Sequence, residues 1–277
     1  MRLGVLGPGS LGLSAAQHAA ERGLEVRLLG RDEAHASLGL ARIQGRWARS
    51  RPATELRITA CAADAASMEG LDILLEALPE DLELKAAAWR SIAPTISGGT
   101  LLLSGTSSLP VGALSRAAGL EGRLLGFHLF VPVARMGIVE IVIPKGTGPE
   151  LAHRTEAFAD ALGLRAVRVA DQAGFAAARM ALAQGLEAMR LLESGAASAE
   201  DLDALMVHGY GHPMGPLELS DRVGLDLRLK IAEILHRETG DPRFEAPELL
   251  RAKVAAGELG RKSGRGFFSW GADGRRL

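Results

Sequence analysis

The sequence predicts an α/β protein in which a doubly wound sheet is followed by an all-helical domain. Up to about Asp171, short apolar runs alternate with helical patterns, and this alternation is typical of βαβ units. After Asp171, apolar residues keep helical spacing with no further strand-like run. The boundary is therefore expected near Ala170, which gives domains of residues 1–170 and 171–277.

Short apolar runs predict the strands of the first domain, and amphipathic segments predict the helices of both domains. The expected strands are residues 2–6, 24–29, 71–77, 100–104, 123–127 and 138–144. The expected helices are residues 10–22, 81–93, 172–193, 199–207, 217–238 and 247–256. Because helices separate the strands, the strands are expected to run parallel.

The composition excludes several classes of protein. Apolar residues make up 47% and charged residues 23%, which is a globular composition, and a net charge of −1 gives no reason to expect nucleic acid or membrane as partner. Cys61 is the only cysteine, and the chain has no His-Glu-x-x-His motif, so neither a disulfide nor a catalytic metal is expected. No apolar run has the length of a signal peptide or a membrane span, so a cytoplasmic protein is expected.

A glycine-rich loop, Gly7-Pro-Gly-Ser-Leu-Gly12, leaves the first expected strand and opens a helix. In this context GxGxxG predicts a Rossmann-type dinucleotide-binding domain rather than a plain strand–helix turn. Gly7 permits the tight turn, Gly9 lets the backbone approach a pyrophosphate, and Gly12 lets helix and strand pack closely. The free N–H groups of the helix N-terminus, around Ser10 and Leu11, would bind the phosphates.

The end of the second expected strand bears on the choice of coenzyme. An acid there accepts hydrogen bonds from the adenosine ribose of NAD, whereas an arginine suits the 2′-phosphate of NADP. If the strand ends at Leu29, Gly30 stands where the acid would be and Arg31 follows. If the strand runs two residues longer, Asp32 is the acid; alternatively, Asp32 caps the next helix. NAD and NADP both remain open.

Eight stretches, each weak alone, occur in one order and spacing. They are residues 7–12, 76–80, 104–110, 126–132, 138–141, 171–175, 211–216 with 221–226, and 260–268. In this register the chain resembles the L-3-hydroxyacyl-CoA dehydrogenase family, from the first strand to near residue 268. The resemblance implies a dinucleotide-binding domain followed by a helical domain, through which members of the family typically form homodimers.

The resemblance also implies an activity, which is oxidation of the C3 hydroxyl of an acyl-CoA to a ketone with hydride passing to NAD. His128 in Gly-Phe-His-Leu-Phe-Val-Pro matches the family's histidine, Glu140 matches its strand glutamate, and Ser107 matches its substrate serine. The positions that match coenzyme-side residues of the family are Glu80, Lys85 and Lys262.

The residue types fit this chemistry. A neutral imidazole such as that of His128 takes the hydroxyl proton near neutral pH, and a carboxylate on its other nitrogen fixes the tautomer. Twelve residues separate His128 from Glu140, enough for the chain to turn at residues 132–137 and return alongside. Ser107 would donate a hydrogen bond to the C3 oxygen. Without the resemblance, Ile-Val-Glu-Ile-Val-Ile is more typical of a strand with one exposed acid.

The chain departs from the family pattern at three expected asparagines, which are replaced by Gly105, Val131 and Ala178. The resemblance places the last two of these positions close to substrate or nicotinamide, so loss of their amides weakens substrate orientation, on which much of the rate depends. The stretch after the second strand carries cations that would meet CoA phosphates or simply form a solvated face; these are Arg42, Arg46, Arg49 and Arg51.

Three interpretations follow for the function. The first is an NAD(P)-dependent dehydrogenase of a 3-hydroxyacyl-CoA such as 3-hydroxybutyryl-CoA. The second is a dehydrogenase of a hydroxy acid without CoA on the same fold. The third is a dinucleotide-binding protein with little catalysis, which the lost asparagines favour. Retention of the histidine, glutamate and serine disfavours the third, because binding alone does not require them.

Overall fold

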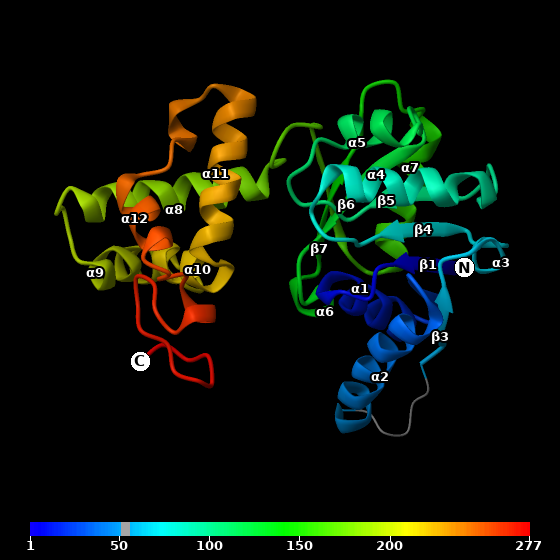
Figure 1. Ribbon diagram of the computed structural model, residues 1–277, viewed down its shortest axis with the longest axis horizontal. Coiled ribbons are helices and arrows are strands. Elements are labelled where there is room, and N and C mark those ends of the chain that lie inside the picture. The colour runs from blue at the N-terminus through cyan, green and yellow to red at the C-terminus, as the bar shows by residue number, and fades with distance from the viewer. Residues whose placement is uncertain (51–55) are drawn as a thin grey trace. The chain divides into compact units, whose positions relative to one another are not determined.

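A computed structural model describes residues 1–50 and 56–277 (Figure 1). The chain forms two compact units, Met1–Phe175 and Ala176–Leu277. The first unit contains a sheet with helices on both faces, and the second unit is built from helices. This is the predicted fold class, a doubly wound sheet followed by an all-α domain.

The sheet of the first unit has eight strands in the order β3-β2-β1-β4-β5-β6-β7-β8. The strands are β1 Arg2–Leu6, β2 Glu25–Gly30, β3 Ile58–Ala62, β4 Ile73–Glu76, β5 Leu101–Ser104, β6 Leu124–Leu129, β7 Ile138–Val142 and β8 Arg165–Val169. Strands β1 to β6 run parallel to one another, and their carboxyl ends therefore share one edge of the sheet. In such sheets ligands bind outside this edge, where the strand order reverses beside β1.

Helices cover both faces of this sheet and bury its strands. The helices of the first unit are α1 Ser10–Glu21, α2 Glu33–Ser50, α3 Ala65–Met68, α4 Leu82–Ile92, α5 Val111–Ala118, α6 Val133–Met136 and α7 Pro149–Ala161. Helices α1, α2 and α7 pack on one face through Ala16, Ile43 and Phe158. Helices α4 and α5 pack on the other through Trp89 and Leu114 (Figure 1). Successive residues of β4 and β5 alternate between the two apolar clusters, as expected for strands buried on both sides.

Strand β7 is antiparallel to β6, which agrees with the expected turn at residues 132–137 and return of the chain. Only the four-residue helix α6 and its flanking turns join these two strands. A parallel return needs a crossover of about a dozen residues or more, so the short connection forces an antiparallel pair. Strands β3 and β8 were not predicted; β8 reads Arg-Ala-Val-Arg-Val and is partly exposed at the edge of the sheet.

The second unit contains α8 Ala177–Glu193, α9 Ala199–Ala204, a π-helical turn Leu205–Gly209, α10 Pro216–Val223, α11 Leu225–Thr239 and α12 Glu248–Ala255. The single helix predicted over residues 217–238 is in fact two helices, because Gly224 between them has φ 105°. The helix predicted from residue 172 begins at Ala177, after Phe175 adopts a positive φ of 47°.

A buried carboxylate fastens the last part of this unit to α10. Asp221 is fully buried and accepts hydrogen bonds from the backbone N–H groups of Phe267 and Phe268 at 2.9 and 3.0 Å. It also accepts one from Nε1 of Trp270 at 2.9 Å. A Cβ atom at Gly266 would lie 2.1 Å from its Oδ1, so only glycine permits this approach.

Candidate active site

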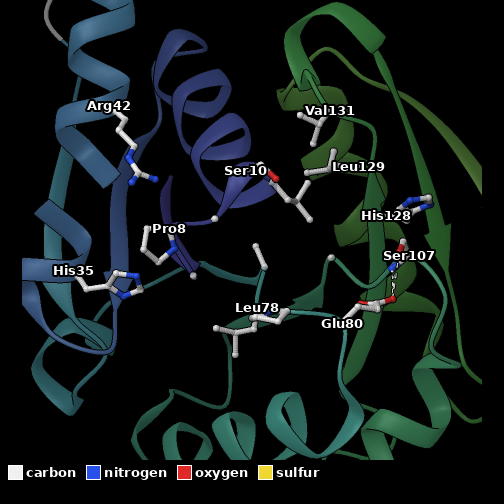
Figure 2. A pocket seen from close by; sticks show the side chains of 16 residues that line it. Pro8, Ser10, His35, Arg42, Leu78, Glu80, Ser107, His128, Leu129 and Val131 are labelled. Atoms are coloured by element: carbon white, nitrogen blue, oxygen red, sulfur yellow. Dashed lines mark hydrogen bonds between the residues drawn. The ribbon is translucent and has the colours of Figure 1, made fainter. Parts of the chain in front are cut away.

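A pocket of about 640 Å³ lies in the first unit, where the carboxyl ends of β1, β4, β5 and β6 meet (Figure 2). It is lined by Gly7, Pro8, Gly9, Ser10, Leu11, His35, Arg42, Ala77, Leu78, Pro79, Glu80, Gly105, Ser107, His128, Leu129 and Val131. Most of the residues predicted for coenzyme or catalysis in the first domain therefore share one cavity. Gly12, Gly30, Arg31, Lys85 and Glu140 stand outside this lining.

The glycine loop has the tight geometry that its sequence predicts. Gly7 has φ 108°, and a Cβ atom on it would lie 2.8 Å from the carbonyl oxygen of Ala77. A Cβ atom on Gly12 would lie 1.9 Å from the carbonyl oxygen of Gly7. Helix α1 starts at Ser10, and no side chain of the described residues caps it. Uncapped N–H groups at a helix N-terminus suit a pyrophosphate, and Gly9, Ser10 and Leu11 line the pocket.

His128 and Glu140 form a buried pair. They are register partners in the antiparallel strands β6 and β7, and Nδ1 of His128 lies 2.7 Å from Oε2 of Glu140. A carboxylate can only accept, so Nδ1 carries the hydrogen and Nε2 of the neutral ring is left as an acceptor. The imidazole lies near the rings of Phe130 and Phe175, at centroid distances of 4.6 and 5.9 Å. The expected return of the chain alongside β6 is therefore present, and Glu140 is not an exposed acid.

The turn after β5 is organised by one carboxylate. Oε1 of Glu80 accepts hydrogen bonds from the hydroxyl of Thr106, the backbone N–H groups of Ser107 and Ser108, and both serine hydroxyls, at 2.7 to 3.2 Å. Burial alone would raise the pKa of Glu80, but the Lys85 ammonium and these hydrogen bonds lower it below its ordinary value. Figure 2 shows Glu80 and Ser107 on the same side of the pocket as His128. Glu80 thus shapes the serine turn as well as the pocket wall.

Lys85 lies beneath the pocket wall and is 1% exposed. Its Nζ donates to Oε1 of Glu76 at 2.7 Å and to the carbonyl oxygen of Leu78 at 3.0 Å, and lies 3.5 Å from Oε2 of Glu80. Glu76 is fully buried and also accepts from the hydroxyl of Ser104 at 2.7 Å. The buried pair of Lys85 and Glu76, with these hydrogen bonds, holds the segment after β4 in one conformation.

The end of β2 is occupied by glycine, arginine and aspartate. The strand ends at Gly30, one residue beyond the expected end. Oδ1 of Asp32 accepts a hydrogen bond from the backbone N–H of His35 at 2.6 Å, so Asp32 caps α2. This hydrogen bond is the main cause that lowers the pKa of Asp32 below its ordinary value. Nε of Arg31 lies 3.3 Å from Oδ2 of Asp32, and the arginine side chain is 81% exposed.

Two of the positions singled out in the sequence belong to the second unit. Nζ of Lys262 lies 2.5 Å from both carboxylate oxygens of Asp226, and hydrogen bonding by this ammonium lowers the pKa of Asp226. Ala178 lies in the first turn of α8. Within this unit, Lys262 is thus held by an ion pair next to the start of α11.

Both units of the chain match models of domains from one enzyme family. Residues 2–172 match the family model described as 3-hydroxyacyl-CoA dehydrogenase, NAD binding domain. Residues 174–270 match the model of the C-terminal domain of the same enzyme. The chain belongs to the 3-hydroxyacyl-CoA dehydrogenase family. It is accordingly an oxidoreductase with a Rossmann-type dinucleotide-binding domain.

Full-length relatives have the same organisation. A 3-hydroxybutyryl-CoA dehydrogenase of Mycobacterium tuberculosis is 36% identical over 280 residues, which covers 97% of this chain and 98% of the relative. A probable 3-hydroxybutyryl-CoA dehydrogenase of Bacillus subtilis is 35% identical and covers 96% of each chain. The crystal structure of (S)-3-hydroxybutyryl-CoA dehydrogenase from Ralstonia eutropha is similar with a TM-score of 0.91 at 31% identity, covering 98% of this chain and 99% of that one.

Two of the three positions where the sequence pattern leads one to expect an asparagine, Gly105 and Val131, line the pocket. A Cβ atom at Gly105 would lie 2.8 Å from Cδ2 of Leu11 and 2.9 Å from the carbonyl oxygen of Glu76, so this position has no room for an amide side chain. Val131 lines the pocket and is 48% exposed. Neither residue gives the cavity an amide side chain.

His35 lines the pocket and was not among the site residues predicted from the sequence. It lies in the first turn of α2, and its Nδ1 is buried without a hydrogen-bond partner among the described residues. Its place just after the second strand was a usable signal, because that turn borders the adenosine site of dinucleotide-binding domains. The predicted cation Arg42 also lines the pocket.

The described part of the chain lacks two features, a membrane-spanning helix and a metal-binding cluster. None of its helices combines the length and the apolar character needed to cross a membrane. Nor does it contain a group of three or more His, Cys, Asp and Glu side chains placed to hold a metal ion.

Proposed function

We propose that this protein transfers a hydride between carbon C3 of a 3-hydroxyacyl-CoA, such as 3-hydroxybutyryl-CoA, and a nicotinamide dinucleotide, with the C3 hydroxyl becoming a ketone. The observation that carries this proposal is the buried pair of His128 and Glu140 beside a pocket whose opposite wall is the glycine loop. The names of the relatives, which act on 3-hydroxybutyryl-CoA, support the choice of substrate.

The coenzyme fits the residues that would hold it. The close approach at Gly7 and Gly12 and the uncapped N-terminus of α1 form a cradle for a pyrophosphate. When bound, the nicotinamide ring supplies the hydride acceptor. The apolar wall at Leu11 and Leu78 would exclude water from the space between the loop and His128.

His128 acts as the general base in oxidation and as the general acid in reduction. With its Nδ1–H donated to Glu140, its Nε2 accepts the proton that leaves the C3 hydroxyl as the carbonyl forms. The negative Glu140 then stabilises the resulting imidazolium, as in other oriented acid–base pairs. Because both residues lie on paired strands, the imidazole is oriented before the substrate binds.

Ser107 would position the C3 oxygen. Its hydroxyl lines the pocket and is bonded to Glu80 at 3.2 Å, the longest of the hydrogen bonds at that carboxylate. Glu80 keeps its other donors if this hydroxyl turns toward a substrate. The serine can therefore donate to a developing oxyanion at small cost to the turn.

Cations near α1 and α2 would bind the phosphates of CoA. Arg46 lines a second pocket of about 340 Å³, which shares Ser10 and Val131 with the first. Arg49 is exposed on the same helix. Arg51, also considered from the sequence, lies outside the described residues.

A hydroxy acid without CoA is the second candidate substrate, because the substrate-holding residues depart from the family pattern. Val131 stands where an asparagine close to substrate or nicotinamide is expected, and it offers no polar side chain to the pocket that it lines. Binding without catalysis is disfavoured by the histidine–glutamate pair, since a binding protein gains nothing from a buried base.

The test mixes purified protein with acetoacetyl-CoA and either NADH or NADPH and follows the loss of reduced-coenzyme absorbance. Turnover that depends on His128 supports the proposal. If the protein turns over a free 3-hydroxy or 3-keto acid but not acetoacetyl-CoA, the acyl-CoA substrate is refuted and the hydroxy acid without CoA is supported. Tight coenzyme binding with no turnover of either substrate overturns catalysis.

We also propose a homodimer that forms through the helical unit and works in the cytoplasm. This unit exposes large apolar side chains, among them Met180 at 72%, Leu205 at 60% and Tyr210 at 76%. Sedimentation velocity should give twice the chain mass, and Tyr210→Glu should lower it. A monomer at all concentrations would refute the dimer.

A further inference from the structure

The adenosine end of the pocket has no carboxylate at the place where NAD-binding domains usually carry one. An acid at the end of the second strand accepts hydrogen bonds from the ribose hydroxyls. Here β2 ends at Gly30, and a Cβ atom on this residue would lie 2.7 Å from both the nitrogen of Ala36 and the carbonyl oxygen of Asp32. No acidic side chain fits this position unless the start of α2 moves.

The next acid along the chain is engaged elsewhere. Asp32 accepts from the backbone N–H of His35 through Oδ1 and lies next to Nε of Arg31 through Oδ2. Its carboxylate therefore caps α2 and partly neutralises Arg31, and it is not among the residues that line the pocket. Glu80, which does line the pocket, already accepts from the serine turn.

Basic side chains occupy this end of the pocket instead. His35 and Arg42, both from α2, line it, and Figure 2 shows both directed toward the space beside Pro8. Nδ1 of His35 is buried and lacks a hydrogen-bond partner in the described part of the chain. Arg42 forms no ion pair with a carboxylate in the described part of the chain. The side chain of Arg31, which follows β2, is 81% exposed.

We propose that Arg31, His35 and Arg42 form a subsite for the 2′-phosphate of NADP(H), so that this coenzyme is preferred over NAD(H). A guanidinium binds a phosphate monoester through paired charge-assisted hydrogen bonds, and the missing acid removes the repulsion that a 2′-phosphate would meet. This inference rests on the proposed use of a nicotinamide dinucleotide.

The 3′-phosphate of CoA is a second adenosine phosphate with the same chemistry. The position of the subsite favours the coenzyme, because His35 and Arg42 share their pocket with the pyrophosphate loop. The phosphate-binding candidate Arg46 lines a different pocket.

Isothermal titration calorimetry of the full chain with adenosine fragments tests the subsite without requiring turnover. Adenosine 2′,5′-bisphosphate should bind at least about tenfold more tightly than 5′-AMP, since hydrogen bonds to charged groups contribute roughly tenfold or more each. Arg31→Ala and Arg42→Ala should each remove about tenfold of this preference and leave 5′-AMP affinity nearly unchanged. Arg57→Ala, at an exposed arginine just before β3 and outside the pocket lining, is the matched control and should change neither affinity.

Equal affinities for 5′-AMP and adenosine 2′,5′-bisphosphate would overturn the subsite. Tighter binding of adenosine 3′,5′-bisphosphate would overturn it as well and assign these cations to CoA. Failure of the proposed activity looks different, because a protein without turnover would still discriminate between the fragments. If the protein is an active dehydrogenase but binds both bisphosphates no better than 5′-AMP, the subsite is refuted and the proposed function still stands.

Discussion

His128 and Glu140 lie directly opposite each other on the antiparallel strands β6 and β7, with Nδ1 of the histidine 2.7 Å from Oε2 of the glutamate. Both side chains are largely buried, at 10% and 5% exposure. The orientation of the imidazole is therefore set by strand register, which is one of the most rigid relationships in a sheet. This pair is the basis of the first two predictions.

Replacement of His128 by glutamine should abolish turnover and leave coenzyme affinity within a few-fold. Loss of a general acid–base lowers kcat by about 10²- to 10⁴-fold, whereas the glycine loop that binds the coenzyme is untouched. Steady-state kinetics and a fluorescence titration with reduced coenzyme measure the two effects. A His128→Gln variant that remains active would remove the histidine from the mechanism.

Replacement of Glu140 by glutamine should lower kcat with little change in the KM for coenzyme. The amide no longer stabilises the imidazolium and permits the wrong tautomer, a defect that costs up to about 10⁴-fold in a comparable oriented pair. Glu140→Asp, which keeps the charge but shortens the side chain, should recover part of the loss. If the glutamine variant matched the original kcat, the pair would be structural only.

Glu80 should contribute to stability in a pH-dependent way. Its pKa in the folded protein is below the ordinary value, so its stabilisation is present at neutral pH and is lost as pH falls through the lowered pKa. Glu80→Gln should therefore lower the free energy of unfolding by about 1–2 kcal/mol at neutral pH, with a smaller difference in acid. Urea unfolding across pH measures this effect. Glu83→Gln, at an acid of α4 whose side chain is 80% exposed, should change little at any pH.

Gly12 should tolerate no side chain. The Cβ atom of Gly12→Ala would overlap the carbonyl oxygen of Gly7 at 1.9 Å, so the loop must open. We expect a loss of about 1–3 kcal/mol in stability together with weaker coenzyme binding. Gly45→Ala is the matched control, because Gly45 lies in α2 and a Cβ atom there meets nothing within 4 Å. That change should stabilise the protein by about 0.5–1 kcal/mol, and similar behaviour of the two variants would contradict the loop geometry.

Much of the fold could be predicted from local pattern. The glycine loop between β1 and α1 and the apolar runs of β4 and β5 are signals contained within a few residues. Elements at the sheet edges were missed, because the partly exposed strand β8 carries two arginines in five residues. The break at Gly224 was hidden, because apolar periodicity continues across it and a single positive φ leaves no pattern in the neighbouring sequence.

The site was harder to predict because its contacts are distant in sequence. Nothing local distinguishes Glu140 from an exposed strand acid, since the distinction depends on the register of β6 and β7. Lys85 was expected on the coenzyme side. In the structure it bonds to Glu76 and is not among the pocket-lining residues, a contact that the local sequence does not indicate. The role of His35 likewise depends on how α2 lies against the glycine loop.

The contact between Asp221 and the segment ending at Trp270 has a consequence for biosynthesis. The partners of this buried carboxylate, Phe267, Phe268 and Trp270, are translated more than forty residues after it. Until these residues emerge from the ribosome, the carboxylate of Asp221 lacks the hydrogen-bond donors that allow its burial, and it must stay hydrated. The helical unit can thus close only after nearly its whole length has been synthesised, whereas the sheet of the first unit, complete by Val169, is free to fold earlier on the nascent chain.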